Sequence, residues 1–263
     1  MIPYPSINPV AFDLGFISVH WYGISYFIGI SIAWILLRYR SSNSSLALNN
    51  EKIADLVFFG MVGIILGGRL GSIIFYNLGY YLENPIEIFY IHQGGMSFHG
   101  GLIGVIVAMY LFSIKTKTSF FKLTDFIATV IPIGLGCGRI GNFINGELWG
   151  SPSNLPWAMI FPDPAAGNIP RHPTQIYEAF FEGIILFLIL WWFTRISRPV
   201  MAASGLFLLC YGTMRFLIEF VRVPDQHIGY VAFDWLTMGQ LLSIPMIIFG
   251  FLFLMMAYKK KTN

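Results

Sequence analysis

The chain has 263 residues, of which 56% are hydrophobic and only 11% are charged. Soluble domains carry about 25% charged residues, so this composition excludes an ordinary soluble domain and indicates a membrane protein. The formal net charge of +3 is too small to indicate nucleic-acid binding. The two cysteines, Cys137 and Cys210, both lie in apolar segments. We interpret them as small buried packing residues rather than as a disulfide framework.

Seven apolar segments follow one another along the chain, and a helix that crosses the hydrocarbon needs about 20 mainly apolar residues. The first 37 residues contain no Lys or Arg, so no cleavable leader is expected and the first apolar segment is a span. Residues 144–173 are expected to form a loop region outside the cytoplasm. The sequence predicts an all-α integral membrane protein, a single polytopic domain over 1–263, with seven transmembrane helices near 18–38, 54–77, 97–113, 124–143, 174–194, 203–223 and 236–257.

Basic residues are distributed unevenly over the expected loops. Eleven fall on one side of the seven-span arrangement: Arg38, Arg40, Lys52, Lys115, Lys117, Lys122, Arg195, Arg198, Lys259, Lys260 and Lys261. Cytoplasmic loops carry the excess of Lys and Arg, so the N-terminus is expected outside and the C-terminus in the cytoplasm. Five arginines lie toward the other half and do not serve topology: Arg69, Arg139, Arg171, Arg215 and Arg222.

The second and third spans carry glycines and two candidate polar residues. Gly63, Gly67 and Gly71 have the four-residue spacing that is typical of close helix packing. Arg69 lies on a different face, where it snorkels, pairs with Glu147 or contacts a lipid headgroup. His99 opens the third span before two glycines, which we expect to leave its ring accessible. A neutral imidazole is a usable base near pH 7, although a histidine at a span end is also a common interfacial residue.

The fourth span ends in the polar stretch GRIGNFINGELWG, residues 138–150. Arg139 and Asn142 are i,i+3 neighbours, and Asn145 and Glu147 follow where the helix is expected to unwind. The glycines serve either helix packing or close backbone approach to a ligand. Non-helical backbone at membrane depth is tolerated only where protein covers it or where it lines water. The combination with Arg, Asn and Glu favours a ligand-facing wall.

The sixth span places four polar residues on an arc of roughly 80°, namely Tyr211, Arg215, Glu219 and Arg222. They form either a salt-bridge ladder, with Glu219 paired to both arginines, or the lining of a polar cavity. Two arginines against one glutamate leave a net positive charge, which favours the cavity. Arginines that converge from different helices suit a carboxylate or a phosphate. In a membrane, the abundant anion attached to apolar chains is a phospholipid headgroup.

The stretch GRIGNFINGELWG closely resembles the signature of the bacterial prolipoprotein diacylglyceryl transferases, and MSFHGGLIG at 96–104 resembles their second hallmark. HWYG at 20–23, GGRLG at 67–71, RHPTQIYE at 171–178 and YGTMRFLIEF at 211–220 also resemble that family in the same order. The resemblance implies a seven-span inner-membrane enzyme whose active site faces the periplasmic half. It also implies a reaction in which the diacylglyceryl group of phosphatidylglycerol moves to the lipobox cysteine of a prolipoprotein. A thioether forms and glycerol phosphate leaves, as the first step of lipoprotein maturation.

The resemblance also implies roles for the site residues. Arg139 and Arg215 bind the phosphate and stabilise charge on the leaving group. His99 is the preferred general base, and Glu147 is either the alternative base or a brace that holds an arginine. The expected partners are phosphatidylglycerol, a prolipoprotein signal peptide with a lipobox cysteine and membrane lipids, with no cofactor and no metal. The residues expected to bind substrate are Tyr22, Arg69, Asn142, Asn145, Gly150, Tyr211, Glu219 and Arg222.

Two other functions fit part of the pattern. A transporter or channel would use the arginines to select an anion, but transporters often carry paired broken helices, and the other half of the chain shows no counterpart of residues 138–150. A lipid-binding scaffold would need the arginines but not an accessible base. His99 therefore distinguishes an enzyme from a scaffold.

Overall fold

The computed structural model describes residues 2–15, 18–42, 46, 48–90, 94–224 and 229–259. Most of these residues are helical, and two small antiparallel sheets accompany the helices. The chain divides into two compact units. One unit consists of Met1–Leu36 together with Asp125–Asn263, and the other is Leu37–Thr124. The strands are β1 (Val10–Asp13), paired with β2 (Ser18–His20), and β3 (Tyr230–Ala232), paired with β4 (Leu236–Thr237).

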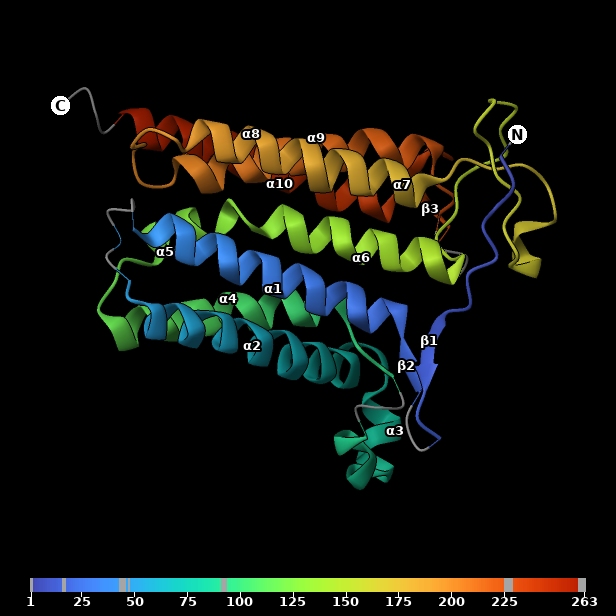
Figure 1. Ribbon diagram of the computed structural model, residues 1–263, viewed down its shortest axis with the longest axis horizontal. Coiled ribbons are helices and arrows are strands. Elements are labelled where there is room, and N and C mark those ends of the chain that lie inside the picture. The colour runs from blue at the N-terminus through green and yellow to red at the C-terminus, as the bar shows by residue number, and fades with distance from the viewer. Residues whose placement is uncertain are drawn as a thin grey trace. The chain divides into compact units, whose positions relative to one another are not determined.

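The unit Leu37–Thr124 is built on two long helices that lie side by side (Figure 1). Its elements in chain order are the end of α1 (Trp21–Ser41), α2 (Asn50–Tyr76), α3 (Leu78–Glu83), η1 (Pro85–Phe89), α4 (Phe98–Thr116) and the start of α5 (Phe120–Ala128). The side chain of Ser97 caps the first turn of α4 by accepting a hydrogen bond from the Gly100 N–H. This cap fixes where α4 begins.

Glycines let α2 and α4 approach with backbone against backbone. A Cβ atom added at Gly67 would lie 2.4 Å from the carbonyl oxygen of Gly100, and one added at Gly104 would lie 2.1 Å from that of Gly63. Real Cβ atoms do not approach so closely, so only residues without a side chain permit this contact. The glycine seam predicted on the second span is therefore confirmed.

The other unit contains the remaining helices. Its elements are most of α1, the end of α5, α6 (Ile131–Asn145), η3 (Pro164–Ala166), α7 (Thr174–Glu178), η4 (Ala179–Ile185), α8 (Leu186–Phe193), α9 (Ala202–Ile218), η5 (Glu219–Val221) and α10 (Met238–Lys259). The segment from α7 to α8 is one continuous helix whose middle, η4, is a π-helical turn. α6 packs against this segment through Gly136 and Gly183. α9 packs along α10 (Figure 1).

Within the described residues, six helices are long and apolar enough to cross a membrane. The pair α5 and α6 makes a seventh span if its 48° bend is counted within one crossing. Apolar side chains face outward along these helices, as for Phe27 of α1, which is 71% exposed. In water such surface would be costly, whereas lipid accepts it. The chain is therefore an all-α integral membrane protein, as its composition predicted.

Three of the expected spans differ from the observed helices. Residues 18–20 form strand β2, so α1 begins only at Trp21. The fourth expected span, 124–143, is broken between α5 and α6, where Pro132 occupies the first turn of α6. The sixth, 203–223, is helical only to Ile218 before a short 3-10 turn. Local backbone chemistry and pairing therefore decide boundaries that hydropathy alone does not resolve.

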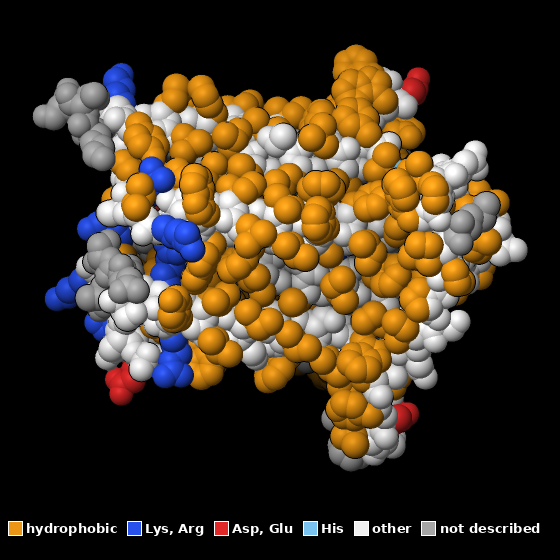
Figure 2. Space-filling model, turned by 45° about the horizontal axis from the view of Figure 1, so that its top comes forward, with side chains coloured by type: hydrophobic (Ala, Val, Ile, Leu, Met, Phe, Trp, Pro, Cys, Tyr) orange, Lys and Arg blue, Asp and Glu red, His pale blue; other side chains and the backbone are white. Residues whose placement is uncertain are grey.

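Basic side chains stand near helix ends, beside surfaces covered by hydrophobic side chains (Figure 2). In the unit Leu37–Thr124, Arg38 and Arg40 lie in the last turn of α1 and Lys115 in the last turn of α4. In the other unit, Lys259 ends α10. Lys260 and Lys261 lie outside the described residues. The orientation of the N-terminus toward the outside stays a prediction from the positive-inside rule.

Candidate functional site

Three helical segments of one unit bring oppositely charged side chains together. Arg139 comes from α6, Glu178 from the end of α7 and Arg215 from the last turn of α9. The Nε atom of Arg139 lies 3.2 Å from Oε2 of Glu178, and Nη1 of Arg215 donates to Oε1 of the same carboxylate. The Glu178 side chain is fully buried. It therefore joins two arginines that are 76 residues apart in sequence.

A second buried carboxylate, Glu182, faces the same two arginines from the π-helical turn η4. Its Oε2 atom lies 3.8 Å from Nη2 of Arg139, and its Oε1 atom lies 3.8 Å from Nη1 of Arg215. Within the described part of the chain, neither oxygen has a hydrogen-bond partner. Charge-assisted hydrogen bonds are about 2.7–2.9 Å long, so Glu182 is paired by charge without being bonded.

Glu219 and Arg222 complete the group, which we call the arginine–glutamate cluster. Nη2 of Arg215 lies 2.9 Å from Oε2 of Glu219, and Nη1 of Arg222 lies 3.9 Å from the same oxygen. Both pairs were among the alternatives that the sequence allowed. The helical position expected for Arg222 is wrong, because α9 ends at Ile218 and Arg222 is extended, with φ −90° and ψ 149°. The cluster consists of Arg139, Glu178, Glu182, Arg215, Glu219 and Arg222.

The formal charge of the cluster is zero, with three arginines and three glutamates. The expected net positive charge is therefore wrong, because it left Glu178 and Glu182 out. A signal for both was present, since Glu178 ends the RHPTQIYE motif and Glu182 follows it at i+4 in an apolar span. Charged residues inside a span rarely stand without partners. Two glutamates on one face of the fifth span thus pointed to buried arginines elsewhere.

Two tyrosines lie on helices that carry cluster residues or pack against such a helix. The Tyr211 ring stacks on Phe207 within α9, with centroids 5.7 Å apart and planes at 9°. Tyr22, on α1, donates or accepts a hydrogen bond with Tyr26 at 3.3 Å between their hydroxyl oxygens. A Cβ atom added at Gly141 of α6 would lie 2.8 Å from Cδ2 of Tyr22. Gly141 therefore lets α1 place Tyr22 directly against the helix that carries Arg139.

The end of α6 arranges two amides around one carboxylate. α6 ends at Asn145, and Gly146 follows in the left-handed region with φ +71°. Oε1 of Glu147 accepts hydrogen bonds from Nδ2 of Asn142 at 2.8 Å and from Nδ2 of Asn145 at 3.1 Å. The Gln175 amide donates to the Glu147 backbone carbonyl. In these contacts Glu147 braces the asparagines, whereas its expected partner was an arginine.

Gly150 lies where the loop after α6 meets the residues that follow α9. Gly150 and Arg222 form an isolated β-bridge, and the Gly150 N–H donates to the His172 carbonyl at 2.9 Å. A Cβ atom at Gly150 would lie 2.5 Å from the Val221 carbonyl oxygen and 2.7 Å from Cγ2 of Thr174. Only a residue without a side chain therefore fits at position 150, whereas the substrate-binding role expected for Gly150 stays a prediction.

Arg171 and His172 hold the same loop. Arg171 lies over the Trp149 ring at 4.2 Å, and its Nε donates to the Ala166 carbonyl at 2.7 Å. Nδ1 of His172 lies 3.2 Å from the hydroxyl of Tyr177. Burial lowers the pKa of His172, so the imidazole is neutral at pH 7. Through these contacts both residues stabilise the structure of the loop.

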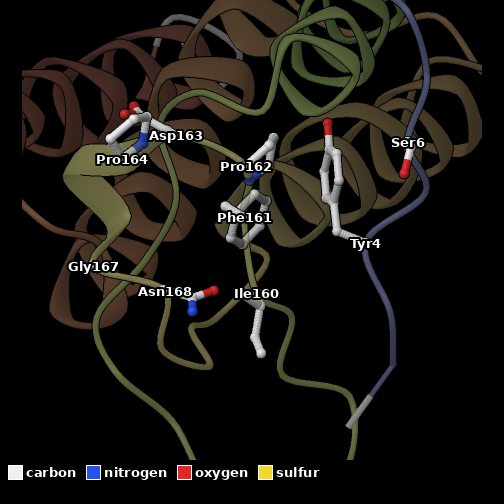
Figure 3. Close-up of a pocket in the computed structure, with 9 residues that line it drawn as sticks. All are labelled: Tyr4, Ser6, Ile160, Phe161, Pro162, Asp163, Pro164, Gly167 and Asn168. Atoms are coloured by element: carbon white, nitrogen blue, oxygen red, sulfur yellow. The ribbon is translucent and has the colours of Figure 1, made fainter.

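An open hollow of about 440 Å³ lies between the loop region and the N-terminal segment. The N-terminal segment supplies one wall, with the Tyr4 ring pointing along it, and the loop around Phe161 supplies the other (Figure 3). The Tyr4 hydroxyl donates to the Phe143 carbonyl, which ties this segment to the end of α6. The lining residues are Tyr4, Ser6, Ile160, Phe161, Pro162, Asp163, Pro164, Gly167 and Asn168. They include none of the residues that the sequence assigned to the site.

The unit Leu37–Thr124 holds the other two sequence-predicted residues. Arg69 is 5% exposed and donates from Nε to the Ile88 carbonyl at 2.9 Å and from Nη1 to the Gly94 carbonyl at 2.7 Å. Its Nη2 donates to the Glu87 carbonyl. Each guanidinium nitrogen of Arg69 thus has a backbone carbonyl as its partner. The sequence had instead suggested a pair with Glu147 or a contact with a lipid headgroup. The ring of Tyr81 lies 5.1 Å from the guanidinium carbon.

His99 lies in the first turn of α4, and its side chain is partly exposed. The sequence predicted an accessible ring beside two glycines, and this partial exposure agrees with it. Gly100 is buried against α2, where an added Cβ would lie 2.3 Å from the Gly67 carbonyl oxygen. Gly100 and Gly104 of the MSFHGGLIG motif thus hold α4 on α2, and His99 stands at the end of that packed pair.

The fold and the cluster define an integral membrane protein that buries paired charges within its spans. The family model of the prolipoprotein diacylglyceryl transferases matches residues 9–256. The phosphatidylglycerol–prolipoprotein diacylglyceryl transferase of Pseudomonas putida is 55% identical over 264 residues, which cover 99% of this chain and 98% of that protein. The protein of the same name from Methylococcus capsulatus is 55% identical over 263 residues and 100% of both chains. That of Pseudomonas aeruginosa is 53% identical over 260 residues, 99% of this chain and 97% of its own.

The chain therefore belongs to the prolipoprotein diacylglyceryl transferase family. It is a transferase of lipoprotein biosynthesis, and the resemblance that its motifs predicted is confirmed.

Proposed function

We propose that the arginine–glutamate cluster is the phosphate-binding site for the family's reaction. The chain transfers the diacylglyceryl group of phosphatidylglycerol to the cysteine thiol of a prolipoprotein. In this reaction the bond between the glycerol carbon and the phosphate oxygen breaks and a carbon–sulfur bond forms. Glycerol phosphate leaves with the bonding electrons, and the thiol proton passes to a base. The first modification of a lipoprotein precursor is thereby complete.

One observation carries the assignment of the phosphate site. Arg139 and Arg215 come from different helices and meet at the same buried carboxylates, so their guanidinium groups already converge on one small volume. A planar guanidinium group binds phosphate through two parallel hydrogen bonds to two of its oxygens. Donors that are fixed in advance stabilise a departing anion most strongly where water is excluded. Arginine itself stays protonated and so does not act as the base.

The base is assigned to His99, with Glu147 as the alternative. His99 has a partly exposed imidazole in the MSFHGGLIG motif, and a thiol with a pKa near 8.5 loses its proton readily to such a group. Glu147 accepts from two amides, which supports a bracing role for its carboxylate. In this proposal Asn142 and Asn145 keep their orientation through Glu147 and donate to the headgroup.

The remaining residues shape or hold the site. Tyr22 and Tyr211 border the lipid headgroup, and Glu219 orients Arg215 through its 2.9 Å contact. Gly150 keeps the loop close to Val221 so that Arg222 reaches the cluster. The backbone contacts of Arg69 favour a structural role over substrate binding.

We further propose that the protein substrate presents a lipobox cysteine at the end of a signal peptide. The enzyme would act in the bacterial inner membrane, with its site toward the periplasmic half. The basic residues at the helix ends that the positive-inside rule assigns to the cytoplasm support this orientation. Labelling of single cysteines introduced near Lys115 and in the loop 144–173 of intact cells tests it, because only the loop should react with an impermeant reagent.

Mass spectrometry tests the activity directly. Purified protein is incubated with phosphatidylglycerol and a peptide that contains a lipobox cysteine, and the peptide should gain the mass of one diacylglyceryl group. The same peptide with serine in place of cysteine is the control and should stay unmodified. If the folded protein leaves the cysteine peptide unmodified as well, the proposed function is wrong.

A pair of variants separates the base from the brace. His99→Gln should lower turnover by about 10²–10⁴-fold, as expected for loss of a general base. Binding of phosphatidylglycerol should stay near that of the wild type. Glu147→Gln keeps one oxygen that accepts a hydrogen bond, so it should retain most of the activity if Glu147 is a brace. Turnover that survives in His99→Gln and disappears in Glu147→Gln would reverse the two roles.

A further inference from the structure

The two glutamates of the fifth span contact the arginines in different ways. Glu178 approaches Arg139 to 3.2 Å and bonds Arg215. Glu182 stays 3.8 Å from the nearest nitrogen of each arginine, and both of its oxygens lack a hydrogen-bond partner within the described residues. Both side chains are fully buried. Glu178 thus has one oxygen hydrogen-bonded to Arg215 and the other paired by charge with Arg139, whereas Glu182 is held near both arginines by charge alone.

The local structure explains why Glu182 stays in this loosely bound place. It lies in the π-helical turn η4, and π-helical turns occur frequently at functional sites. The next residue, Gly183, packs on Gly136 of α6, where an added Cβ would lie 2.8 Å from the Gly136 Cα. This contact holds η4 beside the helix that carries Arg139. Glu182 therefore faces Arg139 and Arg215 with Glu178 as a neighbouring like charge.

We propose that Glu182 is a displaceable counter-ion that occupies the phosphate position when no lipid is bound. The inference rests on the proposed function of the cluster. Buried arginines need a compensating charge in the empty site, and Glu182 supplies it through Nη2 of Arg139 and Nη1 of Arg215. The phosphate of the lipid takes the place of the Glu182 carboxylate beside these nitrogens, while Glu178 keeps its contacts with Nε of Arg139 and Nη1 of Arg215. Glu182 is a positioning residue in this scheme and does not touch the reacting carbon.

The counter-ion has a consequence for product release. With phosphate bound, the cluster contains three glutamates and one phosphate against three arginines, so its net charge is negative. Glycerol phosphate carries more negative charge than the diester phosphate of the lipid, because the broken ester leaves an additional ionisable oxygen. The Glu182 carboxylate therefore disfavours the product more than the substrate and promotes exchange of one for the other.

Inhibition by glycerol phosphate measures this effect. Glu182→Gln keeps the size of the side chain but removes its charge, so glycerol phosphate should inhibit about tenfold more strongly and the KM for phosphatidylglycerol should fall. The kcat should fall as well, because the product leaves more slowly. The matched control is Glu178→Gln, which should lower kcat by about 10²-fold and strengthen inhibition less than Glu182→Gln does, because loss of Glu178 also releases the guanidinium groups that bind the product.

A second variant keeps the inference testable if Glu182→Gln does not fold. Glu182→Asp retains the charge but withdraws it by one methylene from the arginines, so inhibition should strengthen by a smaller factor. Inhibition that is unchanged or weaker in folded Glu182→Gln or Glu182→Asp overturns the inference. Failure of the proposed function is distinguishable, because the wild-type protein would then not modify the lipobox peptide at all.

Discussion

Two buried arginines of the same chain show how the partner of a charge determines its role. Arg69, on α2, donates its nitrogens to backbone carbonyls of the chain between α2 and α4. Arg215, on α9, faces the carboxylates of Glu178, Glu182 and Glu219. Backbone carbonyl oxygens are fixed parts of the fold, so an incoming anion does not displace them. A carboxylate side chain is itself an anion, so another anion such as phosphate is able to take its place. Burial alone therefore does not mark an arginine as a ligand-binding residue.

The strongest test of this comparison is the pair Arg215→Gln and Arg69→Gln. Arg215→Gln should lower kcat by about 10³-fold, because a fixed donor to the leaving phosphate is lost. It should also lower the free energy of unfolding by about 3–5 kcal/mol, since three buried carboxylates lose a partner. Diacylglyceryl transfer and thermal unfolding in detergent measure the two effects.

Arg69→Gln is the matched control for that experiment. It should destabilise the protein while the folded fraction keeps transfer activity within about tenfold of the wild type. If folded Arg69→Gln loses as much kcat as Arg215→Gln, the distinction between carbonyl-bound and carboxylate-bound arginines fails.

A smaller effect is expected from Gly67→Ala, which disturbs the unit of Arg69 without touching a charge. The new Cβ would lie 2.4 Å from the Gly100 carbonyl oxygen and 2.7 Å from the Gly104 Cα, so α2 and α4 would have to separate. We expect a loss of about 1–3 kcal/mol in the free energy of unfolding. Gly79→Ala is the control, since nothing lies within 4 Å of its added Cβ. Equal unfolding temperatures for the two variants would contradict the glycine seam.

The smallest effect is expected at an ion pair outside the buried regions. Lys115 and Asp55 lie 3.2 Å apart with side chains 57% and 53% exposed. Water and salt screen such a pair, so Lys115→Ala should change the free energy of unfolding by less than about 1 kcal/mol. Thermal unfolding at low and high salt measures it. A loss comparable to that of Arg215→Gln would mean that burial does not govern the strength of these pairs.

The sequence by itself determined the class of the protein, its family and four of the six residues of the arginine–glutamate cluster. Apolar runs of membrane length and glycines at four-residue spacing depend on local composition, so they can be read without a fold. Arg139 and Arg215 were identifiable because charge inside a span is costly and therefore conspicuous. Their motifs also carried the resemblance to the transferase family, which the full-length similarity confirms.

Tertiary structure alone decided that Glu178 and Glu182 meet the arginines of other helices. Glu178 lies 39 residues after Arg139 and 37 residues before Arg215, and no spacing rule links residues so far apart. The backbone partners of Arg69 and the amide partners of Glu147 were hidden for the same reason, since hydrogen bonds depend on loop geometry. The pattern of a single span records only its own residues, whereas the charge of a buried site is the sum over every helix that packs there.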